Sequence, residues 1–177
     1  MGNCKSAVVL VGHGGLPSDI PCEIFEKFMS VHKTRVKTES PISSQEVELD
    51  NTIRKWKRTP ETDPYKFGLE TLASRMKSFL KNYTVKTAYN EFCYPSIADA
   101  VKELADENFA KIILVTTMIT RGGSHSEREI PEELEALRLK YRDIDIQYAW
   151  PFDTDTFALY LTTHVRTFDP DSVTFAT

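Results

Sequence analysis

Residues 7–15 read AVVLVGHGG, an apolar, β-branched run that ends in a histidine set between glycines. A second such run, IILV at residues 112–115, is followed by GGSH at residues 122–125. Continuous runs of this kind are typical of strands that are buried on both faces, and glycine lets the backbone turn sharply or approach another group closely. The two segments hold five of the seven glycines in the chain. They predict two central strands, each followed by a histidine loop.

The composition is that of a globular domain. With 177 residues the chain is long enough for one domain with a substantial core, and short for two. Its formal net charge of −4 argues against general nucleic-acid binding. Neither a signal-peptide pattern nor an apolar run of the roughly 20 residues needed to cross a bilayer is found. Three cysteines without CxxC spacing argue against a disulfide framework or a cysteine metal cluster. We therefore expect a cytoplasmic protein that binds neither nucleic acid nor a membrane.

Strands and helices are predicted to alternate along the chain. The strands are expected at residues 6–12, 84–92, 111–118 and 144–148, with helices between and after them. This alternation predicts an α/β fold: a flavodoxin-like three-layer sandwich in which a four-stranded parallel sheet of order 2-1-3-4 carries helices on both faces. We expect one domain over residues 1–168, whose last helix at 154–168 is packed on the core, and a C-terminal tail at 169–177.

This strand order has a consequence for the two histidines. Strands 1 and 3 become neighbours and their loops leave toward opposite faces of the sheet, which opens a crevice at its carboxyl edge. His13 and His125 are expected to face each other there, with Glu91 beside them at the end of strand 2. Two imidazoles and a carboxylate suit a divalent transition metal, and an imidazole, with a pKa near 6.5, can also accept a proton at neutral pH. Taken singly, each of the three could equally be an ordinary loop residue.

Arginines flank the second histidine. Arg121 and Arg128 would lie at the rim of the crevice, where guanidinium groups could bind a substrate rich in carboxylates; alternatively, Arg128 pairs with Glu129 or Glu132 on the surface. The loop residues expected to contact a substrate are Gly14, Gly15, Gly122, Gly123 and Ser124. His32 and His164 lie in expected helices without neighbouring glycines, so we expect both to be structural.

Taken in order, these segments resemble the class II tetrapyrrole chelatases, the CbiX/SirB-type sirohydrochlorin chelatases. The similar pieces are VLVGHG at 9–14, YNEF at 89–92 with PSI at 95–97, GGSH at 122–125 with EIP at 129–131, and a closing helix at 155–166. Together they place the resemblance over about residues 6–30 and 67–168.

The resemblance implies a chelatase-like fold and an enzyme that inserts Co(II), Fe(II) or Ni(II) into sirohydrochlorin or a related acidic tetrapyrrole. It implies no need for ATP, no cofactor beyond the metal substrate, and a place in siroheme or cobalamin biosynthesis. By the same likeness His13 and His125 would handle the metal and accept protons, with Glu91 as the assisting carboxylate. Short members generally pair into homodimers. The alternative is a non-catalytic carrier of metal or tetrapyrrole with the same fold.

The chain departs from the family pattern in three places. Gly15 stands where many relatives have serine, and Glu129 replaces the aspartate usual before Ile-Pro. Residues 33–66 form an insertion that carries RKWKR at 54–58, either a lid with basic residues for substrate carboxylates or an exposed helical decoration. Two other classes fit less well. A histidine phosphatase would have arginine where Gly12 stands, and the glycine motifs of nucleotide-binding modules are missing from the sequence.

Overall fold

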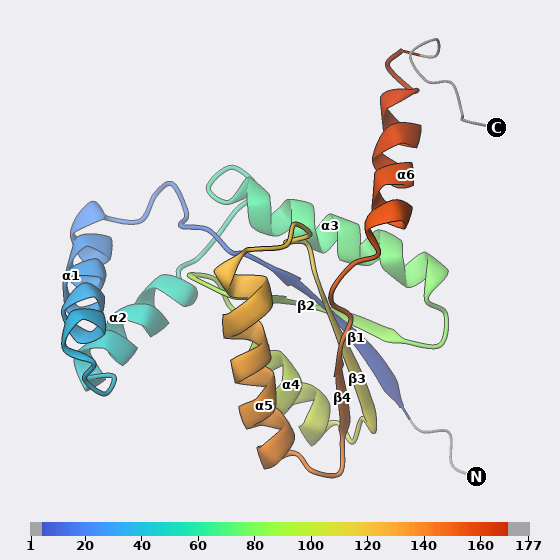
Figure 1. The fold of residues 1–177 in the computed structure, drawn as a ribbon. Helices are drawn as coiled ribbons and strands as arrows, with labels where there is room; N and C mark the ends of the chain where they lie inside the picture. Colours follow the sequence, from blue (N-terminus) through green and yellow to red (C-terminus); the bar gives the residue numbers. More distant parts are fainter. Residues whose placement is uncertain (1–4, 170–177) are drawn as a thin grey trace.

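The structure, a computed structural model, describes residues 5–169. A parallel sheet runs through its centre in the order β2-β1-β3-β4 (Figure 1). Its strands are β1 (Ser6–Gly12), β2 (Thr84–Tyr89), β3 (Lys111–Thr116) and β4 (Asp145–Tyr148). Every pairing in it is parallel. The predicted α/β class and strand order are therefore confirmed, although β2 and β3 end earlier than expected.

The central strand β1 shows why the apolar run decides the fold. Its residues at 7, 9 and 11 pack toward α4 (Ile97–Asp106) and α5 (Ile130–Lys140), in one cluster with both helices. Leu10 instead packs toward α3 (Pro64–Phe79) on the opposite face. A strand buried on both faces has no polar side, and that is the pattern of a parallel sheet covered by helices. The result is a three-layer arrangement with β1 and β3 at its centre (Figure 1).

Two helices form an arm beside the sheet. They are α1 (Cys22–Thr38) and α2 (Ser44–Arg54), and Figure 1 shows them lying apart from the layers that cover the sheet. We call residues 22–58 the arm. Helix α1 continues through the mostly polar residues 33–38, which contain neither glycine nor proline. It ends where Glu39 adopts a left-handed conformation with φ 51° and its N–H caps the preceding turn.

The last helix, α6 (Thr154–Val165), leaves the sheet instead of covering it (Figure 1). The prediction that it is packed on the core is wrong, since none of its residues is buried. Leu161 and Val165 are about half exposed, and Phe168, just beyond the helix, is 80% exposed. The apolar periodicity predicted correctly that α6 has an apolar face, but it does not show whether that face packs on the core of the domain. Beyond Asp169, the expected tail lies outside the described residues. Among the described helices, none is long and apolar enough to span a membrane.

Candidate active site

The glycines around His13 allow two loops to approach each other. Beyond the strands, Asn90 N–H donates to the Gly12 carbonyl at 2.8–2.9 Å and Glu91 N–H donates to the His13 carbonyl in the same range, so the β1–β2 pairing continues into the loops. Gly14 has φ +90°, and a Cβ there would lie 1.9 Å from the Glu91 carbonyl oxygen. A Cβ on Gly12 would meet Leu69 at 2.7 Å. These two glycines are thus required by the protein's own packing, whereas around Gly15 and Gly122 there is open space.

The backbone orients His13. Its Nδ1 lies 2.7 Å from the Gly14 carbonyl oxygen. A carbonyl only accepts, so Nδ1 carries the proton and the Nε2 lone pair is left for another partner. The His13 N–H donates to the Tyr65 hydroxyl at 2.8 Å, which ties the loop to the start of α3. Nε2 lies 3.8 Å from a Glu91 carboxylate oxygen.

His125 does not lie in a loop as expected. It begins a π-helical turn, η1 (His125–Glu129), that runs directly into α5, where the Ile130 N–H donates to the His125 carbonyl. Pro131 lacks an N–H and so cannot complete a regular helical hydrogen bond at this point, which favours the wider turn. The His125 ring nevertheless reaches His13: the two ring centroids are 4.8 Å apart with planes at 85°.

Side chains orient His125. Its Nδ1 lies 2.7 Å from Glu129 Oε2 and 2.9 Å from the Asn90 amide nitrogen, which is itself 3.3 Å from the same Glu129 oxygen. The carboxylate can only accept, so Nδ1–H and the Asn90 amide both donate to Glu129, and His125 Nε2 is left unprotonated. Burial alone would raise the pKa of Glu129, but the hydrogen bonds from His125 and Asn90 outweigh it and lower that pKa. Glu129 is therefore ionised at neutral pH.

Sequence reasoning missed the roles of Glu129 and Asn90. In the sequence Glu129 reads as a replacement for aspartate or a partner of Arg128, and no pattern singles out Asn90. The available signal was spacing: a carboxylate four residues after a histidine lies on the same helical face. Carboxylates that accept from the second nitrogen of a histidine are the usual supports of histidine metal ligands.

His13, Glu91 and His125 meet in one place. One ligand atom from each lies within 4.8 Å of the others, and all three residues are half-buried. Within residues 5–169 this is the group of histidine, cysteine and carboxylate side chains that has the geometry of a metal site. The sequence thus placed the three residues correctly with respect to one another. Their role as ligands stays a prediction.

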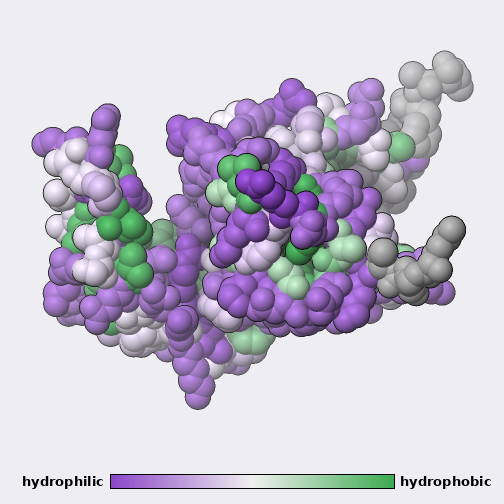
Figure 2. All heavy atoms as spheres, turned by 90° about the horizontal axis from the view of Figure 1, so that it is seen from below, coloured by the Kyte–Doolittle hydropathy of each residue, from purple (hydrophilic) through white to green (hydrophobic). Residues whose placement is uncertain are grey.

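A cavity of about 420 Å³ reaches this group at Glu91, between the arm and α5, and neither of the site's two histidines lines it. The site side of its wall is polar and includes Asn90, Glu91, Glu129 and Glu133. Burial raises the pKa of Glu133. On the arm side the wall is partly apolar, with Phe28, Met29 and Ile42. Figure 2 shows apolar side chains gathered over the arm, next to a furrow that separates it from the body of the molecule.

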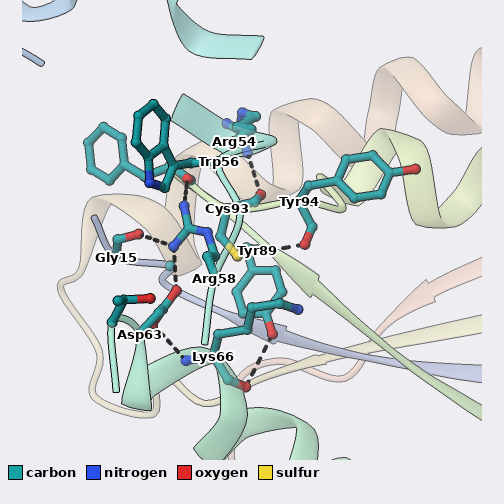
Figure 3. A network of polar contacts seen from close by, with 12 residues as sticks. Gly15, Arg54, Trp56, Arg58, Asp63, Lys66, Tyr89, Cys93 and Tyr94 are labelled. Atoms are coloured by element: carbon teal, nitrogen blue, oxygen red, sulfur yellow. Dashed lines mark hydrogen bonds and ion pairs between the residues drawn. The ribbon is translucent and has the colours of Figure 1, made fainter. Parts of the chain in front are cut away.

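The arginines expected at the rim are exposed. The Arg128 side chain is 67% exposed, and its Nη2 lies 3.8 Å from Glu129, so the surface pairing considered for it is present but long. Arg121 is exposed as well. The stretch at 54–58 differs from both expectations for it. Lys55 and Lys57 face solvent, but Arg54 and Arg58 turn inward toward the site loops (Figure 3).

The fold and the site together define an α/β domain that gathers two histidines and a carboxylate at the carboxyl edge of its sheet. The family model described as CbiX matches residues 62–164, more than half of the chain. The chain belongs to the CbiX family, and the expected metal chelatase is thereby confirmed. The match begins at residue 62, so it includes neither β1 with His13 nor the arm.

One sequence relative agrees with this assignment, and two solved structures were compared for the fold. A sirohydrochlorin cobaltochelatase of Sulfurisphaera tokodaii is 31% identical over 88 residues, which cover 49% of this chain and 69% of the relative. Among solved structures, a cobalamin (vitamin B12) biosynthesis CbiX protein from Marinobacter aquaeolei VT8 superposes with a TM-score of 0.53 at 18% identity, covering 94% of this chain and 99% of that one. The sirohydrochlorin chelatase SirB from Bacillus subtilis subspecies spizizenii, in complex with cobalt, gives a TM-score of 0.49 at 16% identity over 93% and 51%.

Proposed function

We propose that this protein inserts Co(II), Fe(II) or Ni(II) into sirohydrochlorin or a related acidic tetrapyrrole, without ATP, in siroheme or cobalamin biosynthesis. The observation that carries the proposal is the convergence of His13, Glu91 and His125, whose ligand atoms lie within 4.8 Å of one another. Family membership supports the reaction type, and the cobaltochelatase of Sulfurisphaera tokodaii supports sirohydrochlorin as the substrate and cobalt as one metal.

The chemistry needs a held metal ion and a place for two protons. Metallation replaces two pyrrole N–H protons by one divalent cation, so two protons must leave the macrocycle for each metal ion that enters. His13 and His125 each present an unprotonated Nε2, which can ligate the ion first and take up a proton once the ion has moved into the ring. Glu91 adds a negative charge that favours both the cation and a protonated imidazole.

The cavity beside the ligand group supports a placement for both substrates. Its carboxylates at Glu91, Glu129 and Glu133 would attract the metal ion, while the apolar residues of the arm offer a surface for the flat face of a macrocycle. The carboxylates of the tetrapyrrole would repel this acidic wall. We therefore assign them to the exposed Arg121 and Arg128, along the loop that includes Gly122, Gly123 and Ser124, with Gly14 and Gly15 on the opposite side.

The proposal is tested by following the absorbance change of sirohydrochlorin with purified protein and Co(II), Ni(II) or Fe(II) in turn. We expect His13→Ala and His125→Ala each to abolish the acceleration over the reaction without protein, while circular dichroism shows an unchanged fold. His164→Ala is the matched control, since this histidine is exposed on α6, away from the site. Acceleration retained in both site variants would overturn the mechanism.

The same assay separates an enzyme from a carrier. A chelatase metallates many equivalents of sirohydrochlorin per protein molecule. A carrier of metal or tetrapyrrole stops at one equivalent, because it releases neither product nor ligand. We expect multiple turnovers, because the matched family is CbiX and the related Sulfurisphaera tokodaii protein is a cobaltochelatase.

We further propose that two copies pair through α6. The support is its uncovered apolar face: Leu161, Val165 and Phe168 follow one another at helical spacing and are 47%, 49% and 80% exposed. Exposed apolar faces of this kind commonly mark interfaces. Sedimentation should show a dimer that Val165→Glu dissociates and that Thr163→Glu, on the opposite side of the helix, leaves intact. A monomeric parent protein would refute the pairing.

A further inference from the structure

The geometry points to Arg58 as a positioning residue that fixes the distance between the His13 and Glu91 loops. The inference rests on the proposed function of that site, and it gives the arm a role in the reaction that neither a lid nor a decoration would have. Arg58 comes from the end of the arm, and its side chain is only 3% exposed although it carries a full charge.

One guanidinium contacts both ligand loops. Nη1 donates to the Gly15 carbonyl at 2.7 Å, two residues after His13, and Nη2 donates to the carbonyl of Phe92, directly after Glu91 (Figure 3). Nη2 also lies 3.3 Å from the Ile53 carbonyl at the end of α2. The planar fork of arginine holds its two donors at a fixed separation, so these contacts set the spacing of the two carbonyls that they join.

The charge of Arg58 is balanced away from the site. Asp63, whose side chain is also 3% exposed, forms an ion pair with Nη1. Its other oxygen accepts from the Lys66 N–H at 2.9 Å and caps α3. The guanidinium is thus held between the start of α3 and the two loops, and Asp63 neutralises it. Arg58 can therefore position the loops without adding an uncompensated positive charge near a metal ion.

A second arginine completes the contacts of the Glu91 loop. Arg54 donates to the carbonyls of Asn90 and Cys93, both at 3.1 Å, so the two arginines together bind the carbonyls on either side of Glu91. Phe92 adopts φ +52°, a conformation that L-residues rarely take. The backbone holds this conformation because the arginines fix its carbonyls and because the Phe92 ring packs against Phe25 of α1, with ring centroids 5.8 Å apart.

The consequence is a defined place for Glu91. Its carboxylate lies 3.8 Å from His13 Nε2 only while both loops keep their spacing. Without the Arg58 fork, the two loops would keep only their direct backbone hydrogen bonds, from the N–H groups of Asn90 and Glu91. They would lose the bridge farther out, between the Gly15 and Phe92 carbonyls. Supports of this kind around metal ligands are commonly worth 10–100-fold in metal affinity.

The test is Co(II) binding to the full chain without tetrapyrrole, followed by the visible absorption of the bound ion, which reports its coordination. We expect Arg58→Gln to weaken Co(II) binding by about 10-fold or more and to change the spectrum. Arg58→Lys should behave in the same way, because one ammonium cannot bridge both carbonyls; it keeps the charge that Asp63 needs and so protects the fold. Arg138→Gln is the matched control: Arg138 also donates to a backbone carbonyl, that of Ile146 at 2.8 Å, but on β4.

The outcomes separate this inference from the proposed function. If His13→Ala still binds Co(II) like the parent protein, the metal site itself is wrong. If His13→Ala loses binding while folded Arg58→Lys keeps the parent affinity and spectrum, the site stands and the positioning role is refuted. A spectrum altered equally by Arg138→Gln would mean a loss of general stability instead, and would also refute it.

Discussion

His13 and His125 meet edge to face, yet they are held in opposite ways. The backbone holds His13: its Nδ1 donates to a carbonyl, and its loop continues the pairing of the sheet. Side chains hold His125, through the carboxylate of Glu129 and the amide of Asn90. A metal-binding side chain that is oriented by the backbone depends on residues, such as glycine, that allow the backbone conformation of its loop. A ligand oriented by side chains can be adjusted by single substitutions without changing the fold.

The largest effect is expected where the backbone of the His13 loop has no room. Gly14→Ala should lower the free energy of unfolding by about 3 kcal/mol, because its Cβ would lie 1.9 Å from the Glu91 carbonyl at a φ of +90°. Metal binding should fall with it. Urea denaturation measures the free energy of unfolding, and Co(II) titration measures metal binding. Gly15→Ala, with open space around it, is the adjacent control and should stay within about 0.5 kcal/mol of the parent. Equal stability of the two variants would contradict the close approach.

A smaller effect is expected on the His125 side. Glu129→Gln keeps the shape of the side chain but removes the charge that supports the Nδ1–H of His125. Co(II) affinity should fall by about 10-fold while the free energy of unfolding changes little. The matched control is a second histidine–glutamate pair, on the arm: His32 Nδ1 lies 2.9 Å from Glu46, which Arg35 also contacts.

That control should give the reverse pattern. Glu46 is 2% exposed and joins α1 to α2, so Glu46→Gln should cost about 1–2 kcal/mol of stability and leave Co(II) affinity near that of the parent. If Glu46→Gln weakened Co(II) binding as much as Glu129→Gln does, the histidine–glutamate pair at the site would not differ in role from the pair in the arm.

The smallest effect is a pH dependence confined to the arm. Burial alone would raise the pKa of Glu46, but hydrogen bonds from Arg35 and His32 lower it below the usual 4.5. A lowered folded pKa stabilises the protein above the unfolded value, and this contribution is lost as the pH falls through the folded one. Amide exchange in α2 should therefore be steady from pH 7 to 5, after correction for intrinsic rates, and its protection should decline below about pH 4.5. An equal decline in Glu46→Gln would contradict this origin.

The sequence was informative where residue type alone determines the structure. The apolar run at 7–11 predicted a doubly buried central strand, the alternation of elements predicted the sheet order, and both together brought His13 to His125. Asp63 before Pro64 is a typical helix start, and Asp63 caps α3 in the structure. Each of these depends on local pattern and on the general rules of parallel sheets.

What the sequence did not predict depends on partners far along the chain. Arg54 and Arg58 read as charged surface residues. Their acceptors are backbone carbonyls, which every residue has, so the sequence does not show which residues they contact. The π-helical turn at His125 is favoured by Pro131, which lacks an N–H at the start of α5. Sequence patterns do not distinguish such a turn from a loop. The face of α6 was predicted as core, since an apolar stripe is the same whether it packs on its own domain or on another molecule.

The inward turn of the two arginines bears on how such domains could be shortened. Removing the segment 33–66 to obtain a minimal chelatase would leave the carbonyls of Gly15, Asn90, Phe92 and Cys93 without the guanidinium donors that now contact them. A trimmed protein could still form its sheet, but it would have to find new donors for those oxygens before its metal-binding groups came into register. Any transplant of the arm onto a smaller relative should therefore carry Arg54, Arg58 and Asp63 with it.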